Sequence, residues 1–232
     1  MARLLSWQAR VAQMALANGP ASAGSGSNTL ANGSEQTFAG FNTALAFEMT
    51  LPPSQGQRSR SEYGWLLALF NGANATRYEY LDGQRMTAAE ANVPATSAWS
   101  GGGAWAGGAW AVGYGTVALS ANLAKGATTV TLENSLWGHR LNYGDAIGFG
   151  PSYWGCHFVT GVYGSGEYRV WPPIRAALTA GTHRANLQPR LALRAVPGSV
   201  SYGQFNPAYA DGRSARLTEV FHEYVETYFQ DK

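Results

Sequence analysis

The chain has 232 residues, of which 45% are hydrophobic and only 13% are charged. The hydrophobic share is large enough for a folded core, which argues against a disordered chain. The formal net charge is only +2 and Lys and Arg form no run, so composition argues against specific nucleic-acid binding through phosphate contacts.

A surface this poor in charge is typical of proteins that pack against other subunits. Cys156 is the only cysteine, so no internal disulfide forms, which fits a reducing compartment. We expect it to be a small buried residue in a strand rather than a nucleophile. No stretch approaches the roughly 20 apolar residues of a membrane span, and the start of the chain lacks the pattern of a signal peptide. These features predict a cytoplasmic origin and no membrane partner.

The first residues alternate between loops and short regular elements. Residues 3–16 fit a helical stripe and a strand equally well. Residues 18–27 are rich in Gly, Ser and Ala, which predicts a loop. Residues 29–38 carry an Asn-Gly pair near their middle, at positions 32–33, which is a hairpin-turn signal.

The clearest strand of the N-terminal half covers residues 43–51, where apolar and polar or small side chains alternate up to a Pro-Pro pair. The apolar members are Leu45, Phe47, Met49 and Leu51. Residues 58–70 predict one short helix, capped by Ser59 or Ser61. Gly64 weakens that helix by about 1 kcal/mol relative to Ala. Residues 77–80 predict a short strand.

Residues 97–115 form a glycine-rich loop with large aromatic side chains: Trp99, Trp105, Trp110 and Tyr114. One interpretation is a mobile aromatic loop that stacks on sugar rings or docks a partner. The other is a connection whose tryptophans hold it against its own domain. The loop has no GK[ST] sequence and no strand-to-helix context, so it is not a phosphate-binding loop.

The central part of the chain, residues 128–194, predicts a compact β module. Short β-rich runs are separated by turn residues, notably Gly144-Asp145, the Gly-Ser-Gly at 164–166 and Gly181. The Pro-Pro pair at 172–173 removes two ladder donors in a row, so the strand before it ends at Trp171 or lies on an edge. Residues 197–212 are again loop-like, and residues 216–229 fit a strand better than a helix.

These elements together predict a mainly β fold: a sandwich or barrel-type domain with one short helix, plus a compact second β module. We place the N-terminal domain at residues 1–115, the second module at 116–196, and a C-terminal segment returning to the first domain at 197–232.

The sequence contains no recognisable catalytic or metal-binding motif. The four histidines have no metal-ligand spacing, and there is no GxSxG nucleophile elbow. The 14 acidic residues are dispersed, although a fold can still bring two carboxylates together for glycoside hydrolysis. We therefore predict no catalytic residue, no metal, no cofactor and no enzymatic activity.

Several segments, in this order, resemble the phage distal tail protein family. They are GSEQTFAGFNTALAFEMTLPP from Gly33, EYGWLLALFNGANATRYEY from Glu62, LNYGDAIGF from Leu141, WPPIRAALTAGT from Trp171 and QPRLALRAV from Gln188. The resemblance covers most of the chain but rests on pattern rather than on a short motif. The loop at 97–115 has no counterpart in that pattern.

This resemblance implies a structural protein of the virion, made in the host bacterial cytoplasm and located at the phage tail tip. Members form a ring, usually a hexamer, between the tail tube protein and the baseplate hub protein, and often carry fibres. For Arg175, next to the Pro-Pro pair, we expect either a buried role in the turn or an inter-subunit ion pair. The alternative function is a carbohydrate-binding module for host-surface glycans, with Trp99, Trp105 and Trp110 as stacking platforms.

Overall fold

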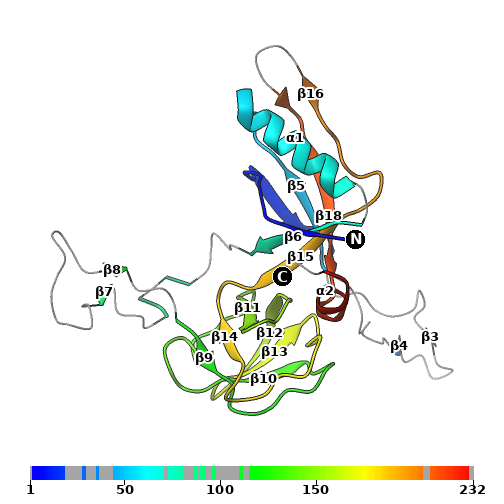
Figure 1. Cartoon of the computed structure of the whole chain (residues 1–232). Helices are drawn as coiled ribbons and strands as arrows, with labels where there is room; N and C mark the ends of the chain where they lie inside the picture. The colour runs from blue at the N-terminus through cyan, green and yellow to red at the C-terminus, as the bar shows by residue number, and fades with distance from the viewer. Residues whose placement is uncertain are drawn as a thin grey trace. The chain divides into compact units, whose positions relative to one another are not determined.

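The chain is mainly β, as predicted, with two six-stranded sheets and two short helices among the residues described by this computed structural model (Figure 1). The described residues are 2–18, 28–29, 35–36, 44–70, 73–80, 86–87, 89–91, 96–97, 110–111, 115–205 and 210–229. They divide into two units, each built around one of the sheets.

Unit 1 combines the two ends of the chain, Met1–Tyr78 and Leu191–Lys232. Its sheet has the order β1 (Leu4–Leu5), β6 (Ala75–Glu79), β15 (Arg190–Ala195), β18 (Ser214–Val220), β5 (Ala46–Thr50) and β2 (Gln13–Leu16). β18 pairs antiparallel with both β15 and β5, and β1 pairs parallel with β6. The two central strands therefore come from the C-terminal part of the sequence.

β5 and helix α1 (Gly56–Phe70) supply much of the core of unit 1. The predicted alternation around β5 is confirmed, because its apolar side chains are buried and Glu48 and Thr50 are exposed. Helix α1 contributes the buried side chains of Trp65, Leu66 and Leu69.

The predicted capping of α1 is wrong. The helix begins at Gly56, three residues before Ser59, so Ser59 and Ser61 both lie inside it. Ser59 is itself buried in the first turn, where its N–H donates to the Gln55 carbonyl oxygen at 3.5 Å.

The C-terminal segment differs from the predicted single strand and gives the chain a second helix. β18 ends at Val220, and α2 (His222–Tyr228) follows it. The buried residues Val225 and Phe229 lie four positions apart, which is helical spacing. Thr227, which a strand would place on the same face as these two side chains, is exposed, so the burial pattern favours the helix.

Residues 3–16, for which helix and strand fitted equally well, contain two strands. These strands, β1 and β2, form the two edges of the sheet of unit 1. The predicted hairpin near residues 29–38 corresponds to β3 (Asn28–Thr29) paired antiparallel with β4 (Glu35–Gln36). Its Asn-Gly turn lies outside the described residues.

Unit 2 spans Glu79–Arg190 and holds the second sheet. All of its strand pairs are antiparallel. The order is β10 (Thr129–Thr131), β13 (Glu167–Trp171), β12 (His157–Gly164), β11 (Ala146–Gly150), β14 (Arg184–Asn186) and β9 (Val117–Ala118). Further two-stranded pairs in the chain are β7 (Thr96–Ser97) with β8 (Trp110–Ala111), and β16 (Gln204–Phe205) with β17 (Ala210–Asp211).

The turn and strand-end predictions for unit 2 are confirmed. Gly144, Gly166 and Gly181 all have positive φ angles, which glycine adopts without steric cost. β13 ends at Trp171, directly before the Pro-Pro pair. The core of unit 2 is apolar and includes Trp137, Ile147, Val159, Val170 and Ile174.

The unit boundaries lie at 78/79 and 190/191. The sequence predicts domain boundaries at 115/116 and 196/197. β6 closes the N-terminal part of unit 1, and β15 opens its C-terminal part. Unit 2 is thus an insertion between two strands that are neighbours in the sheet of unit 1.

Candidate interaction sites

A polar cleft of about 690 Å³ opens in unit 1 at the N-terminal end of α1. Its walls come from three places in the sequence: Arg10 between β1 and β2, the connection from β5 to α1 with the first turns of that helix, and Asp211 at the end of β17. The lining residues are Arg10, Pro52, Pro53, Ser54, Gln55, Arg58, Glu62 and Asp211.

A buried ion pair holds this end of α1 in place. Nη2 of Arg213 lies 2.9 Å from Oε2 of Glu62, and both side chains are 0% exposed. Arg213 also donates to the Pro52 carbonyl oxygen at 3.1 Å and to Oγ of Ser54 at 2.6 Å. Arg58, one turn before Glu62 on α1, donates to Oε1 of Glu62 at 3.2 Å. The network thus ties α1 to the start of β18 and to the connection after β5.

The same contacts keep Glu62 ionised. Burial raises the pKa of Glu62, but hydrogen bonds from Ser54 and Arg58 and the charge of Arg213 outweigh it, so the pKa is lowered from 4.5. A carboxylate held by two guanidinium groups has a structural role here rather than that of a general acid, which needs a raised pKa.

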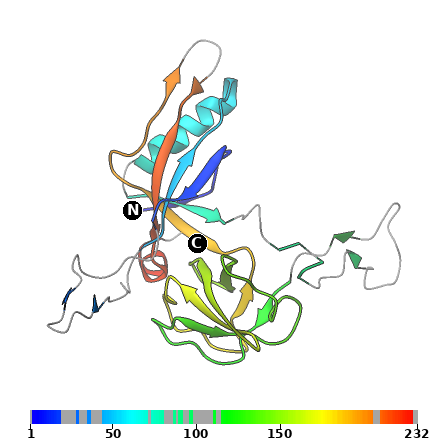
Figure 2. The same ribbon diagram turned by 180° about the vertical axis from the view of Figure 1, so that it is seen from behind.

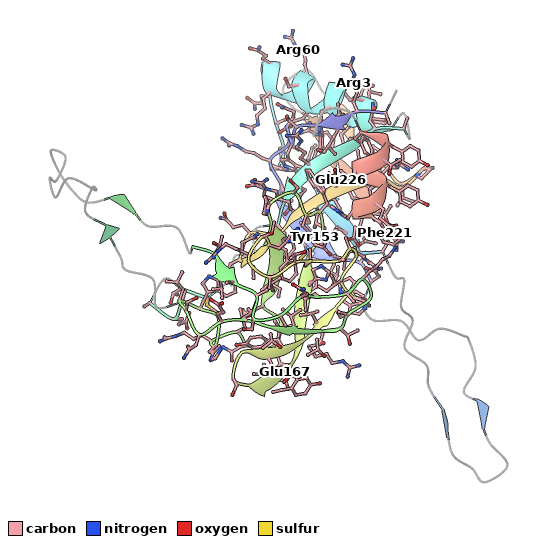
Figure 3. The ribbon with its side chains drawn as sticks, turned by 60° about the horizontal axis from the view of Figure 1, so that its bottom comes forward. Arg3, Arg60, Tyr153, Glu167, Phe221 and Glu226 are labelled. Carbon is pink, nitrogen blue, oxygen red and sulfur yellow. The ribbon has the colours of Figure 1, made fainter. Side chains whose placement is uncertain are left out.

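A pair of stacked tyrosines forms the second candidate site, on α2. Tyr224 and Tyr228 lie one turn apart and are 54% and 60% exposed. Their ring centroids are 5.6 Å apart and their planes differ by 18°. Val225 is buried on another face and anchors the helix. Figure 3 labels Phe221, which precedes α2, and Glu226 on it. We call the two rings the tyrosine face.

A histidine and a tyrosine of unit 2 form a closed, fully buried polar network. Oη of Tyr153 donates to Nε2 of His157 at 2.9 Å, and Nδ1 of His157 donates to the Pro172 carbonyl oxygen at 2.6 Å. The Arg175 backbone N–H donates to Oη of Tyr153 at 2.9 Å. In this arrangement the imidazole is neutral, with Nδ1 as the donor and Nε2 as the acceptor. Tyr153 is labelled in Figure 3.

Burial lowers the pKa of His157 to about 4; the hydrogen bond to Pro172 opposes this shift and the charge of Arg175 adds to it. His157 is therefore a hydrogen-bonded core histidine. Cys156, directly before β12, is buried as expected, but it lies outside the strand in which it was predicted. Neither side chain reaches solvent, so this cluster is not a site for a substrate.

Most of the aromatic residues of the loop at 97–115 lie outside the described residues. Trp99, Trp105 and Tyr114 lie outside the described residues. Trp110 lies in β8, opposite Ser97, and only its backbone is described. Arg175 follows β13 and is buried, a position that favours its role in the turn.

Sequence patterns did not reveal either of the two candidate sites. Ser54 and Arg213 are 159 residues apart, so no local spacing signals their contact. The tyrosine face was missed because its segment was predicted as a strand, in which residues four apart also share a face but are separated by about 13 Å.

Among the described residues, no group of His, Cys, Asp and Glu is arranged to hold a metal ion. No described helix is long and apolar enough to cross a membrane. No protein-family model matches the sequence, and no curated protein matches it.

Proposed function

We propose that the chain is a structural virion protein, a distal tail adaptor that forms a ring and joins the tail tube to the baseplate hub and fibres. The support is the sequence resemblance together with a mainly β architecture in two units. A structural role also suits the buried Arg213–Glu62 pair and the His157–Tyr153 network, whose side chains are closed to solvent.

The observation that carries the proposal is a set of large apolar and aromatic side chains left open to water. Each is more than a third exposed on a chain with only 13% charged residues. They occur in both units: Leu16, Leu67, Tyr224 and Tyr228 in unit 1, and Tyr143, Val162 and Tyr163 in unit 2. Aromatic residues are enriched at protein–protein interfaces and charged residues are depleted there. Sister copies and neighbouring virion proteins would cover such a surface.

Light scattering coupled to size-exclusion chromatography tests this function directly. We expect the purified full chain to form one closed oligomer, which negative-stain electron microscopy would show as a ring. The same ring should bind a column of tail tube protein from the phage that encodes the chain. Discrete rings that cap the tube would establish the adaptor role.

A chain that remains a monomer at every concentration would overturn the adaptor proposal. If the tryptophan fluorescence of that monomer also changed with host-surface glycans, the carbohydrate-binding function would replace it. A polysaccharide hydrolysed by the chain, with loss of activity on substitution of one carboxylate, would instead identify an enzyme.

A further inference from the structure

We propose that the tyrosine face of one copy inserts into the α1 cleft of the next copy, so that the ring is built head to tail. This inference rests on the proposed ring and specifies which surfaces build it. Both surfaces belong to unit 1, and the partner is a second copy of this chain.

The two surfaces lie at opposite ends of one strand. The cleft is at the start of β18, where Arg213 precedes Ser214 and the Leu51 N–H donates to the Arg213 carbonyl oxygen at 2.9 Å. The tyrosine face follows the other end of β18, beyond Val220. Seven residues at about 3.3 Å each separate the two ends by roughly 20 Å. Figure 2 shows β18 running from the β16–β17 hairpin to α2.

This separation has a consequence for symmetry. Because β18 lies between the cleft and the tyrosine face, the two surfaces cannot meet within one copy. A contact between different surfaces of identical copies is heterologous, and it generates a ring if the rotation closes. The placement therefore suits an assembly in which every copy offers one tyrosine face and one cleft.

The cleft has the residue types that accept aromatic rings. Pro52 and Pro53 offer flat apolar surfaces of the kind that pack on aromatic side chains. The exposed guanidinium groups of Arg10 and Arg58 can stack on a tyrosine ring. A volume of about 690 Å³ is within the range of pockets that bury a small ligand.

Charge also favours this pairing. The exposed charges that line the cleft are the guanidinium groups of Arg10 and Arg58 and the carboxylate of Asp211, which leaves an excess of one positive charge. The buried Arg213 and Glu62 neutralise each other. The sequence of α2, HEYVETY, contains two glutamates and neither Lys nor Arg. Opposite net charges guide the two surfaces together and discourage contact between two clefts or two tyrosine faces.

Two complementary variants test the contact without altering the core. In one variant, Tyr224→Ala with Tyr228→Ala removes the tyrosine face. In the other, Arg10→Glu with Pro53→Glu places two carboxylates at the cleft. All four side chains are exposed, so each variant should retain the wild-type melting temperature. Glu133→Ala with Glu167→Ala, at two exposed positions of unit 2 outside the exposed apolar set, is the control and should still form rings.

We expect each unit 1 variant to be a monomer, and an equal mixture of the two to form a one-to-one dimer. In that mixture, the intact tyrosine face of the cleft variant meets the intact cleft of the tyrosine variant, and the dimer has no second functional contact. Light scattering measures the mass. Mixed dimers also show that each variant is folded at its unaltered surface.

The other outcomes separate this inference from the proposed function. If the wild type forms rings and either unit 1 variant also does, the contact lies elsewhere and the adaptor function stands. Monomeric variants that give no dimer on mixing would likewise show that these two surfaces do not meet. A wild type that never forms a ring would overturn the proposed function, and the inference with it.

Discussion

At the residue scale, buried polar groups fix positions that hydrophobic packing alone would leave open. His157 is neutral because its burial lowers the pKa further than the hydrogen bond to Pro172 raises it. Glu62 stays charged because guanidinium groups surround it. The two residues show opposite results of burial, and the difference lies in the charge and hydrogen bonds of their neighbours.

The neutral state of His157 predicts acid sensitivity. In the unfolded chain, the pKa of histidine is near 6.5, whereas in the fold it is about 4. The unfolded state therefore binds more protons between these values, and the free energy of unfolding should fall by roughly 3 kcal/mol as the pH drops from 6.5 to 4. Denaturant titrations across this range measure the slope. His157→Gln should flatten it.

The ion pair at α1 predicts a large loss of stability when it is broken. Arg213→Met leaves the Glu62 carboxylate buried with only Arg58 beside it, and should lower the free energy of unfolding by about 3–5 kcal/mol. Adding Glu62→Met removes the uncompensated charge and should recover part of that loss. Urea denaturation of both variants provides the comparison. Equal stability of Arg213→Met and wild type would contradict the buried pair.

A charge in the core of unit 2 should be similarly costly. Ile174 is 1% exposed, and its backbone is held by hydrogen bonds with Gly126 and Ala127. Ile174→Asp should reduce stability by roughly 2–4 kcal/mol. Val162→Asp, at an exposed position of β12, is the control and should cost no more than about 1 kcal/mol. Thermal melts followed by circular dichroism would distinguish the two variants.

At the element scale, α1 contains a glycine that its environment does not require. A Cβ atom added to Gly64 would meet nothing within 4 Å, and the residue does not have a positive φ angle. Because glycine loses more backbone freedom on folding than alanine, Gly64→Ala should raise the free energy of unfolding by about 0.5–1 kcal/mol.

Gly138 is the contrasting case for the same substitution. A Cβ atom there would clash with the Glu133 carbonyl oxygen and would lie only 2.7 Å from Cγ1 of Val117. Gly138→Ala should therefore destabilise the chain, and parallel melting curves of the two variants would show shifts of opposite sign. A lower melting temperature for Gly64→Ala would contradict the conclusion that the helix does not require glycine at this position.

At the scale of the whole molecule, the topology makes unit 1 depend on both ends of the chain. β6 and β5 lie in the same sheet but are separated by β15 and β18. A fragment of residues 1–78 therefore lacks the two strands that join its halves. Unit 2 has its own sheet and an apolar core within residues 79–190.

Truncation tests this dependence. We expect residues 79–190 alone to unfold in a single cooperative transition, because they retain a complete sheet and core. Residues 1–78 alone should show no such transition, and a chain in which a short linker replaces residues 79–190 should restore it. Circular dichroism with temperature gives the measurement. A cooperative transition in residues 1–78 alone would contradict the observed strand order.

The sequence by itself determined the features that depend on neighbouring residues. The alternation from Leu45 to Leu51 predicts a half-buried strand because strand side chains repeat every two residues. Pro172 and Pro173 end β13 because they cannot donate to the sheet. Glycines at turns follow from the steric cost of a positive φ for other residues.

Only the tertiary structure decided what distant residues do together. Nothing near Arg213 in the chain indicates that its partner is Glu62, because the pair forms only when β18 lies beside β5. The segment after Val220 became a helix because one of its faces is buried, although its β-branched and aromatic content favours a strand. The cleft likewise forms only when Arg10, the residues before α1 and Asp211 come together in the fold. The tyrosine face requires a helix, and that helix depends on the burial of Val225, which local patterns do not encode.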